Sequence, residues 1–170
     1  MKKLLVALWF LALGILIGAQ LGAGLIAPLG IFSFVESKLI TTTAAATIAG
    51  GIFRQLSHLT FAVLAVTLAS LSILKLKNPW PVIALVAACL ALQILETAWI
   101  TPRIIDLRTQ LDMQFGEVAA APKDNPLRHT FGMMHGLSAM RLLLQLGLET
   151  AAFLYGAGTL LSRAARLPPE

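Results

Sequence analysis

Polar and ionisable side chains recur at helical spacing along an apolar segment near the C-terminus. His135, Ser138, Gln145 and Glu149 stand at positions i, i+3, i+10 and i+14, and Leu142 is the apolar residue among them. In a helix this spacing gathers the side chains within roughly 80° of the helical wheel, which makes a polar stripe. Such groups among apolar residues bind a small ligand or ion, handle protons, or join helices through hydrogen bonds. The polar stripe is therefore the strongest functional signal in the sequence.

Two further segments carry ionisable side chains on one helix face. Arg54 and His58 are spaced i, i+4, and Glu96 and Arg103 are spaced i, i+7, so the members of each pair share a face. A carboxylate inside a membrane needs a partner, and we expect Glu96 to pair with Arg54, His58 or His135. Two interpretations stay open, because such pairs either hold helices together or line a binding pocket or proton-handling site.

The composition places these residues in a membrane protein. Of the 170 residues, 58% are hydrophobic and 12% are charged, against about 45–50% and about 25% in soluble domains. The polar side chains are too few to cover a water-facing surface. The net charge of +5 comes without a basic stripe interleaved with aromatic residues, so we expect the lipid bilayer, and no nucleic acid, as a partner. The sequence predicts one integral membrane domain over residues 1–170.

Apolar runs predict four membrane spans. No charged residue interrupts the run from Leu4 to Val35, which is much longer than the apolar region of about 7–15 residues in a signal peptide. The predicted fold class is all-α, a polytopic membrane four-helix bundle with interfacial amphipathic helices in the two long connections. The spans are expected at about 4–32, 56–74, 80–100 and 131–161.

Glycine and proline residues predict where these helices begin and end. Pro28 predicts a kink or an end of the first helix. Gly50-Gly51 predicts a break between an interfacial helix and the second span. Thr101-Pro102 and Asn125-Pro126 each pair a capping side chain with a proline, which predicts the start of an amphipathic interfacial helix and of the last helix.

Small residues mark a second kind of surface on the first span. Gly14, Gly18 and Gly22 recur every fourth residue, and this spacing gives a flat face against which another helix packs closely. Two partners fit this glycine face. One is a second copy of the chain or another membrane protein. The other is the second span, whose matching small residues are Ala62, Ala65 and Ala69.

The density of Lys and Arg predicts the orientation. Basic residues crowd the termini and the short turn between the second and third spans, at Lys2, Lys3, Lys75, Lys77, Arg163 and Arg166. The positive-inside rule places both termini and this turn in the cytoplasm, and we expect the inner membrane of a bacterium. Four alternating spans then bring the remaining polar side chains near the outer face, as an outward-facing polar pocket. Its candidates are Arg54, His58, Glu96, Arg103, His135, Ser138 and Glu149.

Several short motifs resemble those of one family of small membrane proteins. The stretch from Phe131 to Ser138 fits the pattern F-x-x-x-H-G-x-S, and Trp99 to Arg103 fits W-x-x-P-R. The stretch ending at Phe53 fits A-G-x-x-A-G-x-x-F without its first glycine. In order and spacing these motifs are similar to those of the transmembrane-protein-205-like family, four-helix membrane proteins without an established biochemical activity.

The resemblance covers nearly the whole chain and implies the fold more than the function. It places His135, Ser138, Pro102, Arg103, Gly50 and Phe53 at the family's motif positions. The chain departs from the family at Leu142, where many relatives carry Asn, and this argues against a polar network along that face.

The sequence predicts a binding protein rather than an enzyme. The chain lacks G-x-S-x-G, H-E-x-x-H and a phosphate-binding loop, which are signatures of common catalytic sites. We expect an integral membrane protein whose pocket binds a small ligand, an ion or a partner subunit, without a cofactor or metal. The alternative is a haem or copper site that uses His58 and His135.

Overall fold

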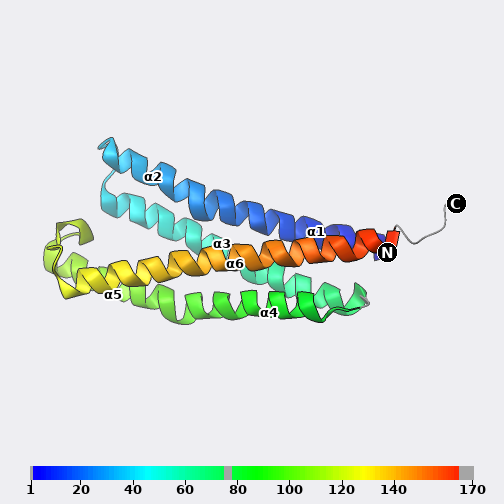
Figure 1. The fold of residues 1–170 in the computed structure, drawn as a ribbon. Helices are drawn as coiled ribbons and strands as arrows, with labels where there is room; N and C mark the ends of the chain where they lie inside the picture. Colours follow the sequence, from blue (N-terminus) through cyan, green and yellow to red (C-terminus); the bar gives the residue numbers. More distant parts are fainter. Residues whose placement is uncertain (1, 75–77, 165–170) are drawn as a thin grey trace.

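Four long helices lie side by side and make up almost all of the structure (Figure 1). The computed structural model describes residues 2–74 and 78–164. The first long helix joins α1 (Lys2–Ala19), the π-helical η1 (Gln20–Ile26) and α2 (Ala27–Glu36). The second is α3 (Thr42–Leu74). The third joins α4 (Trp80–Leu95), the π-helical η2 (Glu96–Ile100) and α5 (Thr101–Phe115). A 3-10 turn, η3 (Val118–Ala120), precedes the fourth, α6 (Pro126–Ala164).

All four are long and apolar enough to cross a membrane. The suitable segments are Val6–Glu36, Thr42–Leu71, Trp80–Phe115 and Pro126–Thr159. Large apolar side chains such as Leu11, Val66, Met140 and Leu154 are more than half exposed on the outside of the bundle, as expected of side chains that face lipid. A helix is also the structure that satisfies its own backbone hydrogen bonds in a bilayer. The all-α class is therefore confirmed, and each of the four predicted spans falls in a helix long and apolar enough to cross a membrane.

The helices form a closed ring around an apolar core. α1 contacts α3 and α6, and α4 contacts the same two helices from the other side. The core is built from buried residues of α1, α3 and α4, which include Trp9, Leu13, Leu64 and Val86, and partly buried residues of α6 pack against it. Figure 1 shows the start of α1 and the end of α6 at one end of the bundle, with the α2–α3 and α5–α6 connections at the other.

The predicted break at Gly50-Gly51 is wrong, because α3 runs without interruption from Thr42 to Leu74. A glycine weakens a helix by about 1 kcal/mol relative to alanine in water. In lipid, an open turn would leave backbone groups without any partner, and the helix is kept. The first connection is consequently a short turn between Glu36 and Thr42, in which Lys38 has a φ of 58°.

Two prolines inside the long helices, Pro28 and Pro102, each follow a π-helical segment. Pro28 and Pro102 are each the second residue of the α-helix that continues the chain. The residue before each proline donates its backbone N–H to the carbonyl five positions earlier, from Ala27 to Gly22 and from Thr101 to Glu96. Proline has no backbone N–H to donate, and the wider π-helical turn before it accommodates the missing hydrogen bond. The helices therefore pass through the positions where the sequence predicted an end or a new start.

The predicted start of the last helix is confirmed. The Asn125 side chain accepts hydrogen bonds from the backbone N–H groups of Leu127 at 2.9 Å and Arg128 at 3.3 Å. These bonds satisfy donors that a helix N-terminus leaves free. Of the basic residues behind the predicted orientation, Lys75, Lys77 and Arg166 lie outside the described residues.

Candidate functional site

A network of polar side chains, with buried amide and carboxylate groups at its centre, crosses the middle of the bundle. Gln145, near its centre, is 0% exposed and lies 19 residues from each end of α6. All four long helices contribute to this central network, and two of its members begin the π-helical segments. The members are Gln20, Ser57, Gln93, Glu96, Thr97, Thr101, Ser138, Arg141, Gln145 and Glu149.

Glu96 occupies the end of the network nearer to the long connections. Its Oε1 accepts hydrogen bonds from the hydroxyls of Ser138 at 2.8 Å and Thr101 at 3.0 Å. Its Oε2 lies 3.3 Å from Nε of Arg141, within ion-pair distance but without hydrogen-bond alignment. Both charged side chains are about one-tenth exposed. This is a buried interhelical ion pair between η2 and α6.

Gln93 links this ion pair to α3. Its Oε1 accepts a hydrogen bond from a terminal nitrogen of Arg141 at 3.1 Å. Its Nε2 donates to the hydroxyl of Ser57 at 2.6 Å and to that of Thr97 at 3.3 Å. The amide therefore satisfies donors and acceptors on three helices at once.

Glu149 occupies the opposite end of the network and is 1% exposed. Its Oε1 accepts two amide hydrogen bonds, from Gln145 at 2.8 Å and from Gln20 at 2.9 Å. Its Oε2 is buried and has no hydrogen-bond partner. The Arg141 guanidinium connects the two ends, because it also donates to Oε1 of Gln145. One guanidinium therefore pairs directly with Glu96 and reaches Glu149 only through the amide of Gln145.

The structure brings three of the seven predicted site residues together, namely Glu96, Ser138 and Glu149. The partner predicted for Glu96 was wrong, since the guanidinium beside it belongs to Arg141 on α6. The expectation drawn from Leu142 was also wrong. The network passes this buried leucine through its neighbours Arg141 and Gln145.

The other four predicted residues lie on the outside of the bundle. Arg54 and His58 are exposed on α3. Arg103 is exposed on α5 and pairs with Asp106 at 3.3 Å. His135 is exposed on α6, where its ring stacks on that of Phe131 with centroids 6.1 Å apart.

The rotation of each helix accounts for these positions. In the turn that contains His135, the inward position is taken by Met134, which is 5% exposed. One residue turns the helix by about 100°, and His135 therefore points away from the face that buries Gln145. Among the described residues, no group of three or more His, Cys, Asp or Glu is placed to hold a metal ion. The haem or copper site at His58 and His135 stays a prediction.

Gln20 is one of the network members that were not predicted from the sequence. It is the only amide side chain in the uncharged run from Leu4 to Val35, and it is 1% exposed. That isolation among apolar residues was the available signal. Arg141 and Gln93 were also left out of the predicted site, because a helical wheel places them beside their faces without saying what they meet.

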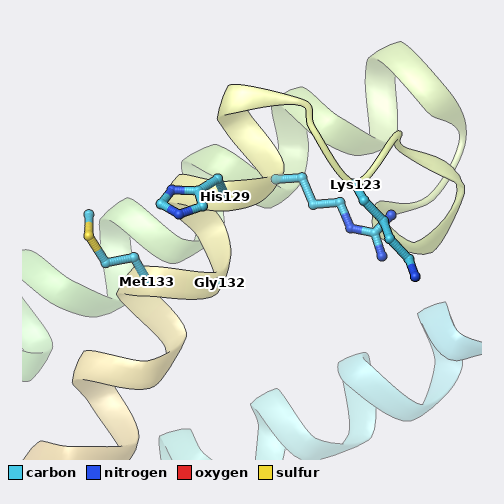
Figure 2. A pocket seen from close by; sticks show the side chains of 5 residues that line it. Lys123, His129, Gly132 and Met133 are labelled. Carbon is cyan, nitrogen blue, oxygen red and sulfur yellow. The ribbon is translucent and has the colours of Figure 1, made fainter.

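Two cavities lie outside the network, and neither is lined by a predicted site residue. The first, of about 450 Å³, lies near the start of α6 (Figure 2). Figure 2 shows Lys123 in the preceding loop and His129 and Met133 on the helix; Arg128 and Gly132 complete the lining. The second is an apolar groove of about 620 Å³ where Ala19 and Ala23 face α3.

The glycine face of the first long helix is open. A side chain added at Gly14, Gly18 or Gly22 would meet nothing within 4 Å. The alternative in which this face packs against the second span is therefore wrong. Oligomer formation through the same face stays a prediction.

In comparisons with known protein families, curated proteins and solved structures, the chain matches none of them. The site is therefore interpreted from its own geometry.

Proposed function

We propose that this chain is a non-enzymatic integral membrane protein that binds a small cation, either a proton or a monovalent metal ion, in the central network. The observation that carries the proposal is the carboxylate of Glu149. It is 1% exposed in the middle of a helix suited to crossing a membrane, and one of its oxygens has no hydrogen-bond partner.

The charge balance of the network supports this proposal. Glu96 lies beside Arg141 at 3.3 Å, and Glu149 touches only amide groups. With both carboxylates ionised and one guanidinium present, the network has one negative charge in excess. A charge at the centre of a membrane helix is unfavourable by about 2.5–3.5 kcal/mol on insertion scales. A bound cation removes this excess.

The surroundings of Glu149 also favour binding over a purely structural role. Interhelical hydrogen bonds in membrane proteins contribute on average only about 0.6 kcal/mol each. Serine, threonine and amide side chains supply such bonds without an excess charge. Both ends of the network also begin at π-helical residues, Gln20 and Glu96, and π-helical turns are frequent at functional sites.

Two further assignments belong to the proposal. The motifs that end at Phe53, Arg103 and Ser138 support membership in the transmembrane-protein-205-like family. The density of Lys and Arg supports a bacterial inner-membrane location with both termini in the cytoplasm. With that orientation, the α2–α3 and α5–α6 connections face outward.

Thermal unfolding of the purified protein tests the proposed function. Wild type, Glu149→Gln and the control Glu36→Gln are compared at constant ionic strength in choline, Li⁺, Na⁺ and K⁺ salts, and over a pH series. Glu36 is an exposed carboxylate on α2. We expect one cation or the proton to raise the Tm of wild type and of Glu36→Gln, and to leave Glu149→Gln unchanged.

The size of the effect is set by binding linkage. A ligand at about 100 times its Kd stabilises the folded protein by about 2.7 kcal/mol. If no cation and no pH separates wild type from Glu149→Gln, the proposed function is wrong.

A further inference from the structure

Two unpartnered oxygens flank a hydrogen bond between the first and last long helices. Gln20 on η1 donates from Nε2 to Oε1 of Glu149 on α6 at 2.9 Å. The remaining oxygen of each side chain, Oε1 of Gln20 and Oε2 of Glu149, is buried without a hydrogen-bond partner. Both residues are 1% exposed. Each of these two oxygens is therefore a hydrogen-bond acceptor that faces no donor.

The direction of the hydrogen bonds around Glu149 is fixed by Arg141. A guanidinium has only donors, so the oxygen of Gln145 that faces Arg141 accepts. The amide nitrogen of Gln145 then faces Glu149 and donates to Oε1 at 2.8 Å. Since Oε1 of Glu149 also accepts from Gln20, Oε2 is the only position on this carboxyl where a donor is still needed.

A proton on Oε2 supplies that donor. A protonated carboxyl has one O–H donor and keeps its acceptor oxygen. A primary amide offers a donor and an acceptor side by side in the same way. Nε2 of Gln20 already donates to Oε1 of Glu149. With a proton on Oε2, the O–H of Glu149 would donate to Oε1 of Gln20. The two side chains would then close a ring of two hydrogen bonds that satisfies both unpartnered oxygens.

A metal ion fits this place less well than a proton, because it exchanges its water shell for several oxygen ligands. Calcium takes six to eight oxygen ligands and magnesium requires near-octahedral coordination. The pair offers two free oxygens, and the other oxygens of the network already take part in hydrogen bonds or face Arg141. A proton shared between a carboxyl and an amide needs only two oxygens, one to carry it and one to accept its hydrogen bond.

We propose that Glu149 binds a proton on Oε2 and shares it with Gln20, so that the two side chains form a proton-binding pair that links η1 to α6. The inference rests on the proposed function and names the cation as the proton. Proton uptake turns the carboxylate into the acid, and the network then holds one carboxylate, Glu96, and one guanidinium, Arg141. Its net charge becomes zero.

Few other titratable or charged groups face this pair. On α6 itself the group is Arg141, and on α4 it is the buried thiol of Cys89. Glu96 on η2 acts through Arg141. The first long helix has no charged residue between Leu4 and Val35. On α3, Arg54 and His58 are exposed.

Infrared spectroscopy of the protein in lipid nanodiscs tests this inference. A protonated carboxyl has a C=O band separate from that of a carboxylate. We expect wild type at neutral pH to show an acid band that shifts when glutamate is labelled with ¹³C. The band should disappear in Glu149→Gln and persist in Glu96→Gln.

The role of Gln20 is read from the position of that band. In Gln20→Leu the acid O–H loses its acceptor, and the band should move to higher wavenumber. In Gln20→Asn, which keeps an amide, the band should move less. The control Gln55→Leu removes an exposed amide on α3 and should leave the band in place. An unchanged band in Gln20→Leu would overturn the assignment of Gln20.

The outcomes separate this inference from the proposed function. If wild type has no glutamate acid band while a metal cation raises its Tm through Glu149, the proton is the wrong ligand and the proposed cation site stands. If the band is absent and no cation or pH acts through Glu149, both proposals fall. The ¹³C shift is measured on wild type together with Glu96→Gln, so the result does not require Glu149→Gln to fold.

Discussion

Two arginine ion pairs of equal length, one buried and one exposed, differ in their surroundings. Arg141 and Glu96 are 3.3 Å apart with side chains 10% and 12% exposed, and Arg103 and Asp106 are 3.3 Å apart with side chains 53% and 52% exposed. Breaking a buried pair leaves an uncompensated charge in an apolar medium. An exposed pair exchanges its partner for water or ions.

The first prediction compares the arginines of these two pairs. Arg141→Met should lower the free energy of unfolding by about 3–5 kcal/mol, because Glu96 is left as a buried single charge. The control Arg103→Met should lower it by about 0–1 kcal/mol. Reversible denaturation in detergent micelles measures both values.

Replacing Glu96 as well should recover part of the free energy of unfolding that Arg141→Met loses. In the double variant Arg141→Met with Glu96→Gln, no single charge remains at this end of the network. If Arg141→Met and Arg103→Met lower the free energy of unfolding equally, the buried pair contributes no more to stability than the exposed one.

Helix packing in the apolar half of the bundle depends on one small residue. A Cβ built at Gly156 would overlap the Trp9 ring, which is itself 3% exposed. The ring is planar and held by edge-on contact with Phe10. The first and last long helices therefore approach closely because this position has no side chain.

The second prediction follows from this contact. Gly156→Ala should destabilise the protein by about 1–3 kcal/mol, because overpacking forces the ring or the helix to move. Gly158→Ala, two residues along the same helix with nothing within 4 Å, is the matched control. We expect it to leave the Tm unchanged or to raise it slightly. A Gly156→Ala variant with the Tm of Gly158→Ala would contradict the close approach.

The third prediction concerns the start of α6. Asn125→Ala removes the acceptor for the N–H groups of Leu127 and Arg128, and should lower the free energy of unfolding by about 1 kcal/mol. Asn125→Asp keeps a side-chain acceptor and should therefore retain most of the free energy of unfolding that Asn125→Ala loses. Hydrogen exchange of the two amides reports the same change locally. Equal protection in Asn125→Ala and wild type would exclude a capping role.

The length of the helices relates the site to the membrane. α6 has 39 residues and is therefore about 58 Å long, while the hydrocarbon core of a bilayer is about 30 Å thick. Parts of the bundle extend beyond the lipid core. The central network lies near the middle of each long helix, which leaves the exposed Arg103–Asp106 pair closer to one end.

The fourth prediction tests the orientation of the whole molecule. Single cysteines are placed at Asn78 and Lys123, two exposed positions in opposite connections, in a chain with Cys89→Ala. We expect a membrane-impermeant thiol reagent applied to intact cells to label position 123 and not position 78. The wild-type cysteine is buried and should stay unlabelled. The reverse pattern would invert the orientation proposed from Lys and Arg density.

The sequence alone determined the class of the molecule and much of its local structure. Hydrophobicity and its periodicity are properties of a single helix, so four membrane helices, the polar stripe of α6 and the Asn125 cap followed from the order of residues. The same local rules failed at Gly50-Gly51. There the lipid environment, rather than intrinsic preference, decides whether a helix continues.

Tertiary structure decided which polar groups meet. Whether Glu96 faces Arg141 or His135 depends on the rotation and relative height of two helices, and on the change of register that π-helical turns introduce before Pro28 and Pro102. These quantities are set by packing between segments far apart in the chain. For the same reason Gln20, a single amide in an apolar run, became a partner of Glu149 only once the first and last long helices were side by side.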